Sequence, residues 1–131
     1  MSAQPMHLIL GGRHMGKRAY ADSLYGPAFV PCDLASADLA LLTSADRVLN
    51  LQEGVRRLLL AGTDAGEFFR AHLEDLRTCV LIGTEVGCGV VPTDPMERRW
   101  RDETGFLYQM LAHEAAIVDR VWCGLALRLK G

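Results

Sequence analysis

The sequence lacks the long apolar runs and the strong excess of positive charge that mark membrane-spanning and nucleic-acid-binding proteins. No apolar run approaches the roughly 20 residues that cross a bilayer, and the first residues show no charged segment followed by an apolar stretch. The formal net charge of −2 gives no broad positive field for nucleic acid or anionic lipid. We therefore expect a cytoplasmic protein with no membrane span, no secretion signal and no nucleic-acid partner.

Closely spaced cysteine pairs are also absent. The four cysteines are Cys32, Cys79, Cys88 and Cys123, and none belongs to a C-x-x-C motif. Each lies in or beside an apolar run, which predicts buried, free thiols that stay reduced in the cytoplasm. A zinc site is the less favoured alternative, because structural zinc sites usually contain close ligand pairs.

What the sequence does contain is an alternation of short apolar runs and helical patterns, typical of a parallel sheet covered by helices. Strands are expected at residues 6–10, 28–32, 46–51 and 79–83, followed by a final pair at 118–123 and 126–129. Helices are expected at 17–24, 55–60 and 68–76, and a further helix begins at Pro95 with Asp94 as its cap and Glu97 in a capping-box position. Pro31 places the second strand at a sheet edge or a strand end. Since no linker or repeat interrupts the pattern, residues 1–131 are expected to form one domain.

The residues between the first strand and the first helix match the phosphate-loop pattern G-x-x-x-x-G-K. The candidate phosphate-binding residues are Gly11, Gly12, Arg13, His14, Met15, Gly16, Lys17 and Arg18. Glycines let successive backbone N–H groups turn toward phosphate oxygens, the helix N-terminus adds partial positive charge, and the lysine reaches the outer phosphates. A glycine-rich turn with a solvated lysine is the alternative, but the strand–helix context favours a nucleotide-binding loop. The expected fold class is therefore α/β, a P-loop NTPase-like three-layer sandwich with a mainly parallel sheet.

Two positions around this loop differ from a standard magnesium-dependent site. Arg18 stands where Ser or Thr would supply a hydroxyl to Mg²⁺, and a guanidinium cannot ligate a cation. Asn50 stands where an acidic residue is expected at the end of a neighbouring strand, so its contribution to a metal would be weak and through a bound water. Either Mg²⁺ is held differently or phosphoryl transfer is impaired.

The second half of the chain carries a more specific signal. The run Val80–Pro92 reads V-L-I-G-T-E-V-G-C-G-V-V-P, the following helix contains R-R-W-R-D, and the chain finishes C-G-L-A-L-R-L-K. Together with the phosphate loop, these motifs resemble the bifunctional adenosylcobinamide kinase/adenosylcobinamide-phosphate guanylyltransferase family of cobalamin biosynthesis. The resemblance covers residues 6–20 and 79–130. It identifies the chain as a shortened and divergent member.

The departures from that family are informative. Its members have a longer segment between the second and third strands, which carries the histidine that receives GMP; here residues 32–47 contain no histidine. His7, His72 and His113 are expected to have structural or solvated roles. His14 lies inside the loop, where it shapes the loop or touches phosphate, and phosphoramidate chemistry there is the less favoured alternative.

The resemblance implies a nucleotide-binding protein that uses GTP or ATP, takes adenosylcobinamide as its corrinoid substrate and forms a homo-oligomer. Lys17 would stabilise charge on a transferred phosphoryl group. Glu85 would either act in catalysis, by orienting a metal-bound water or accepting a substrate proton, or fix the Gly87–Gly89 turn. Three hypotheses follow: a kinase-type phosphotransferase, a catalytically impaired nucleotide-binding partner or regulatory protein of the corrinoid pathway, and an interaction module with a vestigial loop. No guanine-reading motif distinguishes GTP from ATP.

Overall fold

The computed structural model describes residues 4–86 and 94–131 and shows a six-stranded sheet with helices on both faces. The elements in chain order are β1 (His7–Gly11), α1 (Lys17–Tyr25), β2 (Pro31–Asp33), the 3₁₀ helix η1 (Leu39–Thr43), β3 (Arg47–Leu49), α2 (Leu51–Leu60), α3 (Ala65–Ala71), α4 (Leu73–Leu76), β4 (Val80–Thr84), α5 (Pro95–Glu114), β5 (Ile117–Trp122) and β6 (Leu125–Lys130).

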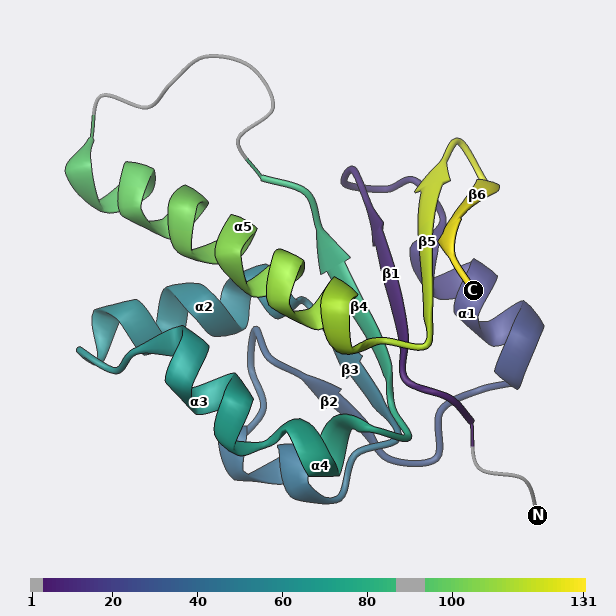
Figure 1. Ribbon diagram of the computed structural model, residues 1–131, viewed down its shortest axis with the longest axis horizontal. Coiled ribbons are helices and arrows are strands. Elements are labelled where there is room, and N and C mark those ends of the chain that lie inside the picture. The colour runs from purple at the N-terminus through teal and green to yellow at the C-terminus, as the bar shows by residue number, and fades with distance from the viewer. Residues whose placement is uncertain (1–3, 87–93) are drawn as a thin grey trace.

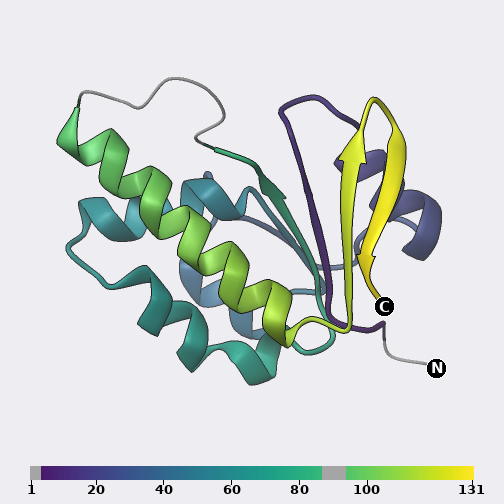
Figure 2. The same cartoon turned by 45° about the horizontal axis from the view of Figure 1, so that its top comes forward.

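The strand order is β2-β3-β4-β1-β5-β6, and every neighbouring pair is parallel except the β5–β6 hairpin. Helix α1 lies on one face of the sheet, and α2, α3, α4 and α5 lie on the other (Figures 1 and 2). This arrangement confirms the predicted α/β three-layer fold with a mainly parallel sheet. None of the helices in the described ranges is long and apolar enough to cross a membrane.

Two apolar clusters fill the spaces between the layers, and alternate residues of the central strands divide between them. Leu8 and Leu81 belong to the larger cluster under α2 to α5, whereas Ile9 and Ile82 pack beneath α1. Strands that are buried on both faces read as continuous apolar runs, because both sets of side chains need a dry environment. The sequence of β1 and β4 follows directly from this requirement.

Two strands are shorter than expected. The second begins only at Pro31, which has no N–H to donate and lies in an edge strand, as predicted. The third ends at Leu49 because Asn50 adopts a left-handed conformation, with φ 58°, and Leu51 already belongs to α2. Asparagine tolerates this backbone region better than most residues. Strand β3 therefore ends two residues earlier than its apolar pattern indicates.

The start of α5 confirms the predicted cap. The Asp94 carboxylate accepts a hydrogen bond from the Met96 backbone N–H at 2.8 Å, and Pro95 occupies the first helical turn. The Glu97 carboxylate, expected in a capping-box position, pairs with Arg56 of α2 at 2.7 Å. Helix α5 is thereby joined to its neighbour by its first turn as well as by its apolar face.

The cysteines are only partly as expected. Cys32 and Cys79 are buried free thiols, but Cys123 is exposed, which corrects the prediction made from its apolar neighbourhood. The cause is local, because Cys123 lies in the tight turn between β5 and β6, with φ 50°. Cys88 lies outside the described residues.

Candidate phosphate-binding site

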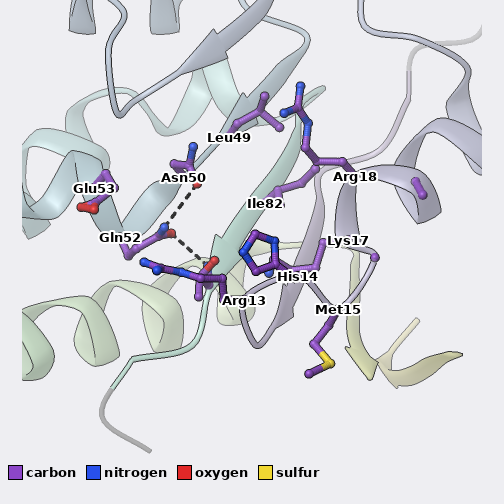
Figure 3. Close-up of a pocket in the computed structure, with 13 residues that line it drawn as sticks. Arg13, His14, Met15, Lys17, Arg18, Leu49, Asn50, Gln52, Glu53 and Ile82 are labelled. Atoms are coloured by element: carbon purple, nitrogen blue, oxygen red, sulfur yellow. Dashed lines mark hydrogen bonds between the residues drawn. The ribbon is translucent and has the colours of Figure 1, made fainter. Parts of the chain in front are cut away.

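A cavity of about 550 Å³ opens where β1, β3 and β4 reach their carboxyl ends. Open α/β sheets place ligands at this edge. The cavity is lined by Arg13, His14, Met15, Gly16, Lys17, Arg18, Ala19, Leu49, Asn50, Gln52, Glu53, Ile82 and Thr84 (Figure 3). The structure thus brings most of the predicted loop residues and Asn50 into one hollow.

The loop reaches this position through two left-handed residues. His14 has φ 59° and Gly16, the residue that precedes α1, has φ 96°. A side chain at Gly16 would be strained in that conformation, which explains the second glycine of the motif. The N-terminus of α1 follows at once, so the partial positive charge of the helix acts on the cavity.

Lys17 is the first residue of α1 and is buried, with 8% of its surface exposed. Its Nζ donates to the backbone carbonyls of Gly12 at 2.6 Å and Gly11 at 3.3 Å. Burial lowers the pKa of the Lys17 ammonium, and the nearby Glu85 carboxylate acts in the opposite sense. The predicted phosphate-contacting lysine therefore lies across the inside of the loop rather than in solvent.

The outer side of the loop rests on β4 and on the β5–β6 hairpin. The Gly11 carbonyl accepts a hydrogen bond from the Glu85 backbone N–H at 2.9 Å, and a Cβ added to Gly11 would lie 2.5 Å from the Val121 carbonyl oxygen. The Met15 carbonyl accepts a hydrogen bond from the Gly124 backbone N–H at 2.9 Å. These contacts explain why the first residue of the motif must be glycine, and they hold the loop from outside.

Arg18 has an exposed side chain that extends toward Leu49 and away from Lys17 (Figure 3). Its guanidinium therefore lies at one end of the cavity. No hydroxyl occupies this helix position, so the ligand that usually contributes to Mg²⁺ is missing here.

Asn50 lines the cavity and is held there by a short chain of hydrogen bonds. Its Nδ2 donates to the Asp33 carboxylate at 2.8 Å, and its Oδ1 accepts from Gln52 Nε2 at 3.3 Å. Gln52 Oε1 in turn accepts from the Thr84 backbone N–H at 2.9 Å (Figure 3). This network fixes the ends of β3 and β4 relative to each other.

Gln52 and Glu53 line the cavity but were not predicted from the sequence. They lie in the first turn of α2, and only the early end of β3 brings them to the cavity edge. Glu53 Oε2 lies 3.5 Å from Arg56 Nε, so its charge is partly compensated. The available signal in the sequence was Glu53, an acidic residue three positions after Asn50, but it belongs to no motif.

The donor set around the loop does not fit the usual Mg²⁺ site. Magnesium prefers carboxylate and hydroxyl oxygens together with substrate phosphates. Among the described lining residues, the cavity offers the Glu53 carboxylate, the Thr84 hydroxyl and the Asn50 amide oxygen, which Gln52 already engages. Within residues 4–86 and 94–131, no group of three or more His, Cys, Asp or Glu side chains is placed to hold a metal ion.

Glu85 is close to the loop but is engaged by an ion pair. Its two carboxylate oxygens accept hydrogen bonds from Arg120 of β5 at 2.8 and 3.0 Å. It is not one of the described residues that line the cavity, although it directly follows Thr84, which is. The Gly87–Gly89 turn that it was expected to fix lies outside the described residues, so its role stays a prediction.

His14 and His7 lie in different environments. His14 is exposed at the rim of the cavity, whereas His7 is completely buried beneath α1. The His7 ring nitrogens lie 2.7 Å from the Tyr25 hydroxyl and 2.6 Å from the Asp119 carboxylate. His7 therefore belongs to the packed interior, in keeping with its expected structural role.

Comparison with known proteins adds a family to this geometry. The model of the cobinamide kinase / cobinamide phosphate guanyltransferase family matches residues 40–129, a range that begins after the phosphate loop. A segment of 52 residues, 40% of this chain, is 40% identical to the bifunctional adenosylcobalamin biosynthesis protein CobP of Pseudomonas aeruginosa and spans 30% of that relative. Because the family match covers more than half of the chain, this protein belongs to the cobinamide kinase / cobinamide phosphate guanyltransferase family.

Proposed function

We propose that this protein binds GTP or ATP through the Gly11–Lys17 loop and acts in cobalamin biosynthesis by transferring a phosphoryl group to adenosylcobinamide. The observation that supports it most is the position of Lys17. Its ammonium lies inside a glycine loop, at the N-terminus of α1 and on the wall of the cavity at the carboxyl ends of the strands. The family membership supplies the corrinoid substrate.

In this proposal each part of the site has a separate task. The backbone N–H groups of the loop and the N-terminus of α1 hold the phosphates, and Lys17 exchanges its bonds to the loop carbonyls for bonds to phosphate oxygens. Charge that develops on the transferred group is then met by an ammonium already desolvated by the protein. Glu85, held by Arg120, is placed to influence the charge of Lys17.

Guanylyl transfer through a histidine adduct is not part of the proposal. The family carries that histidine between the second and third strands. Here the connection from β2 to β3 consists of η1 and short turns and contains no histidine.

The test is incubation of the purified protein with GTP or ATP, Mg²⁺ and adenosylcobinamide, with phosphorylated corrinoid as the readout. Removing the lysine in Lys17→Ala should reduce transfer by at least about a hundredfold, as expected for a group that stabilises transition-state charge. Arg70→Gln, an exposed substitution on α3, should leave the rate unchanged. Equal rates in the wild type and Lys17→Ala would refute phosphoryl transfer at this loop.

Arg18 and Asn50 favour a second candidate, a nucleotide-binding partner or regulatory protein with little catalysis. Backbone amides can hold phosphates without a metal, whereas transfer usually needs Mg²⁺. Calorimetry with and without Mg²⁺ separates the two functions. Affinity that ignores the metal, together with no phosphorylated corrinoid, would establish the second candidate, and strong metal dependence would exclude it.

A further inference from the structure

We propose that a second, smaller cavity beside the phosphate loop binds a phosphoryl group distinct from those of the nucleotide, through Arg18 and Arg47. This cavity has a volume of about 230 Å³ and lies between α1, the start of β2 and β3. It is lined by Arg18, Asp22, Pro27, Ala28, Pro31, Arg47 and Leu49. Arg18 and Leu49 also line the first cavity, so the two hollows are neighbours.

Arg47 carries the inference because it is a buried cation with unused hydrogen-bonding capacity. Only 3% of its surface is exposed. Its Nη1 donates to the Asp22 carboxylate at 2.5 Å and to the Gly26 carbonyl at 3.0 Å. Its Nε is buried and has no hydrogen-bond partner among the described residues. A buried donor without a partner is costly, so a phosphate oxygen that reached this nitrogen would remove that cost.

Arg18 supplies the second cation. It lies one helical turn before Asp22 on α1, and its side chain extends toward Leu49, which also lines both cavities (Figure 3). Asp22 is itself more than half exposed and compensates only one of the two guanidinium charges. The cavity wall therefore keeps a net positive charge.

The ligand class follows from charge, shape and size. Guanidinium groups present paired N–H donors that match the oxygens of phosphate. Small-molecule sites usually occupy about 300–1,000 Å³, so this cavity suits a phosphoryl group rather than a whole nucleotide. We identify the ligand as the phosphate of a monoester whose remaining part extends outside the cavity.

The inference rests on the proposed function only in taking the first cavity as the nucleotide site. The inference explains why an arginine, Arg18, occupies the position where Ser or Thr usually binds Mg²⁺. Its side chain would bind the phosphoryl group in the neighbouring cavity. The second substrate or product would then be recognised by its phosphate, next to the nucleotide but not through the Gly11–Lys17 loop.

The test is an NMR titration of the ¹⁵N-labelled protein with inorganic phosphate, following two sets of amide signals. Gly12 and Gly16 report the loop, and Asp22 and Ala28 report the second cavity. We expect Arg18→Gln to weaken the response of Asp22 and Ala28 roughly tenfold, the loss of one charge-assisted contact. Arg70→Gln on α3 is the matched control and should change neither set.

Two further variants separate the inference from the proposed function. Lys17→Ala should abolish the response of the loop signals and leave that of Ala28 in place. Asp22→Asn removes the carboxylate that competes for Arg47 and should tighten the response of Ala28 several-fold. If Ala28 does not respond to phosphate, or responds equally in the wild type and Arg18→Gln, the second site is refuted. If the loop signals respond neither to phosphate nor to GTP or ATP, the proposed function is refuted instead.

Saturation with a non-hydrolysable nucleotide completes the test. Phosphate should still shift the Ala28 signal when nucleotide fills the first cavity. Loss of that response would show that the nucleotide's own phosphates occupy the second cavity, and it would overturn the inference.

Discussion

At the scale of single residues, Arg18 and Asn50 differ in functional group from the residues that a standard phosphate loop and its neighbouring strand would supply. Both positions line the larger cavity. The first supplies a cation in place of a hydroxyl, and the second supplies an amide in place of a carboxylate. That these two changes weaken metal binding stays a prediction, which rests on the change of functional group at each position.

Introducing a hydroxyl at position 18 and a carboxylate at position 50 should make nucleotide binding depend on Mg²⁺. In Arg18→Ser/Asn50→Asp, the new hydroxyl and carboxylate add two oxygen ligands of the kind that Mg²⁺ prefers. We expect Mg²⁺ to tighten nucleotide binding at least about tenfold more in the double variant than in the wild type, measured by calorimetry. The same gain in an Arg70→Gln/Asn50→Asp control would mean that position 18 does not contribute.

His7 gives a second prediction at this scale, concerning pH. Burial lowers the pKa of its imidazole below the ordinary value of 6.5, although the Asp119 carboxylate acts in the opposite sense. Below that ordinary value the unfolded chain takes up a proton that the folded protein resists. The free energy of unfolding should therefore fall as the pH drops from 7 toward 5, by at most about 1.4 kcal/mol per pH unit from this group.

Denaturant titrations at several pH values test the assignment. His7→Gln removes the titrating group and should flatten the dependence between pH 7 and 5, even if it lowers overall stability. His113→Gln, at an exposed position in the last turn of α5, should keep the wild-type slope. An unchanged slope in His7→Gln would assign the pH dependence to other groups.

At the scale of elements, prediction succeeded where one local signal determines the structure. Helix α5 begins where Asp94 and Pro95 indicate, and β1 and β4 follow their apolar runs. The shortening of β3 could not be predicted, because it depends on the left-handed Asn50, whose side chain bonds to Asp33, 17 residues away in the chain. Because β3 ends early and α2 begins at Leu51, Gln52 and Glu53 were not predicted as site residues.

The packing of α5 on β4 can be tested with a pair of glycines. A Cβ at Gly83 would lie 2.5 Å from the Tyr108 hydroxyl oxygen, and that hydroxyl donates to the Thr84 carbonyl at 2.6 Å. Gly83→Ala should therefore lower the free energy of unfolding by about 1–3 kcal/mol. A Cβ at Gly105 meets nothing within 4 Å, so Gly105→Ala should raise it by about 0.5–1 kcal/mol.

Thermal and urea unfolding of the two variants provide the measurement. Both variants replace glycine by alanine. Opposite changes in the free energy of unfolding would therefore reflect the different surroundings of the two positions. A neutral Gly83→Ala variant would show that Tyr108 moves without cost, and the close contact between α5 and β4 would then carry no stability.

At the scale of the whole molecule, the sheet ends in an exposed apolar strand. All residues of β6 are exposed, among them Leu125, Leu127 and Leu129, and Trp122 of β5 is 57% exposed. β6 is an edge strand, which offers unpaired backbone groups for pairing with another chain. This surface suits the expected homo-oligomer, which stays a prediction.

Placing a charge on this strand should break the assembly. Leu127→Glu introduces a carboxylate where an interface would exclude water, so light scattering should report a smaller species than for the wild type. The circular dichroism spectrum should be unchanged, because Leu127 is 61% exposed in the single chain. A wild-type protein that is monomeric at micromolar concentration would rule out self-association through this face.

The contact between the hairpin and the phosphate loop has a consequence for how the protein responds to its own concentration. The Gly124 N–H and the Met15 carbonyl join the tip of the β5–β6 turn to the loop. Restraint of either partner reduces the freedom of the other, and such a linkage is reciprocal. If copies associate through β6, nucleotide should promote assembly, and assembly should tighten nucleotide binding by the same factor.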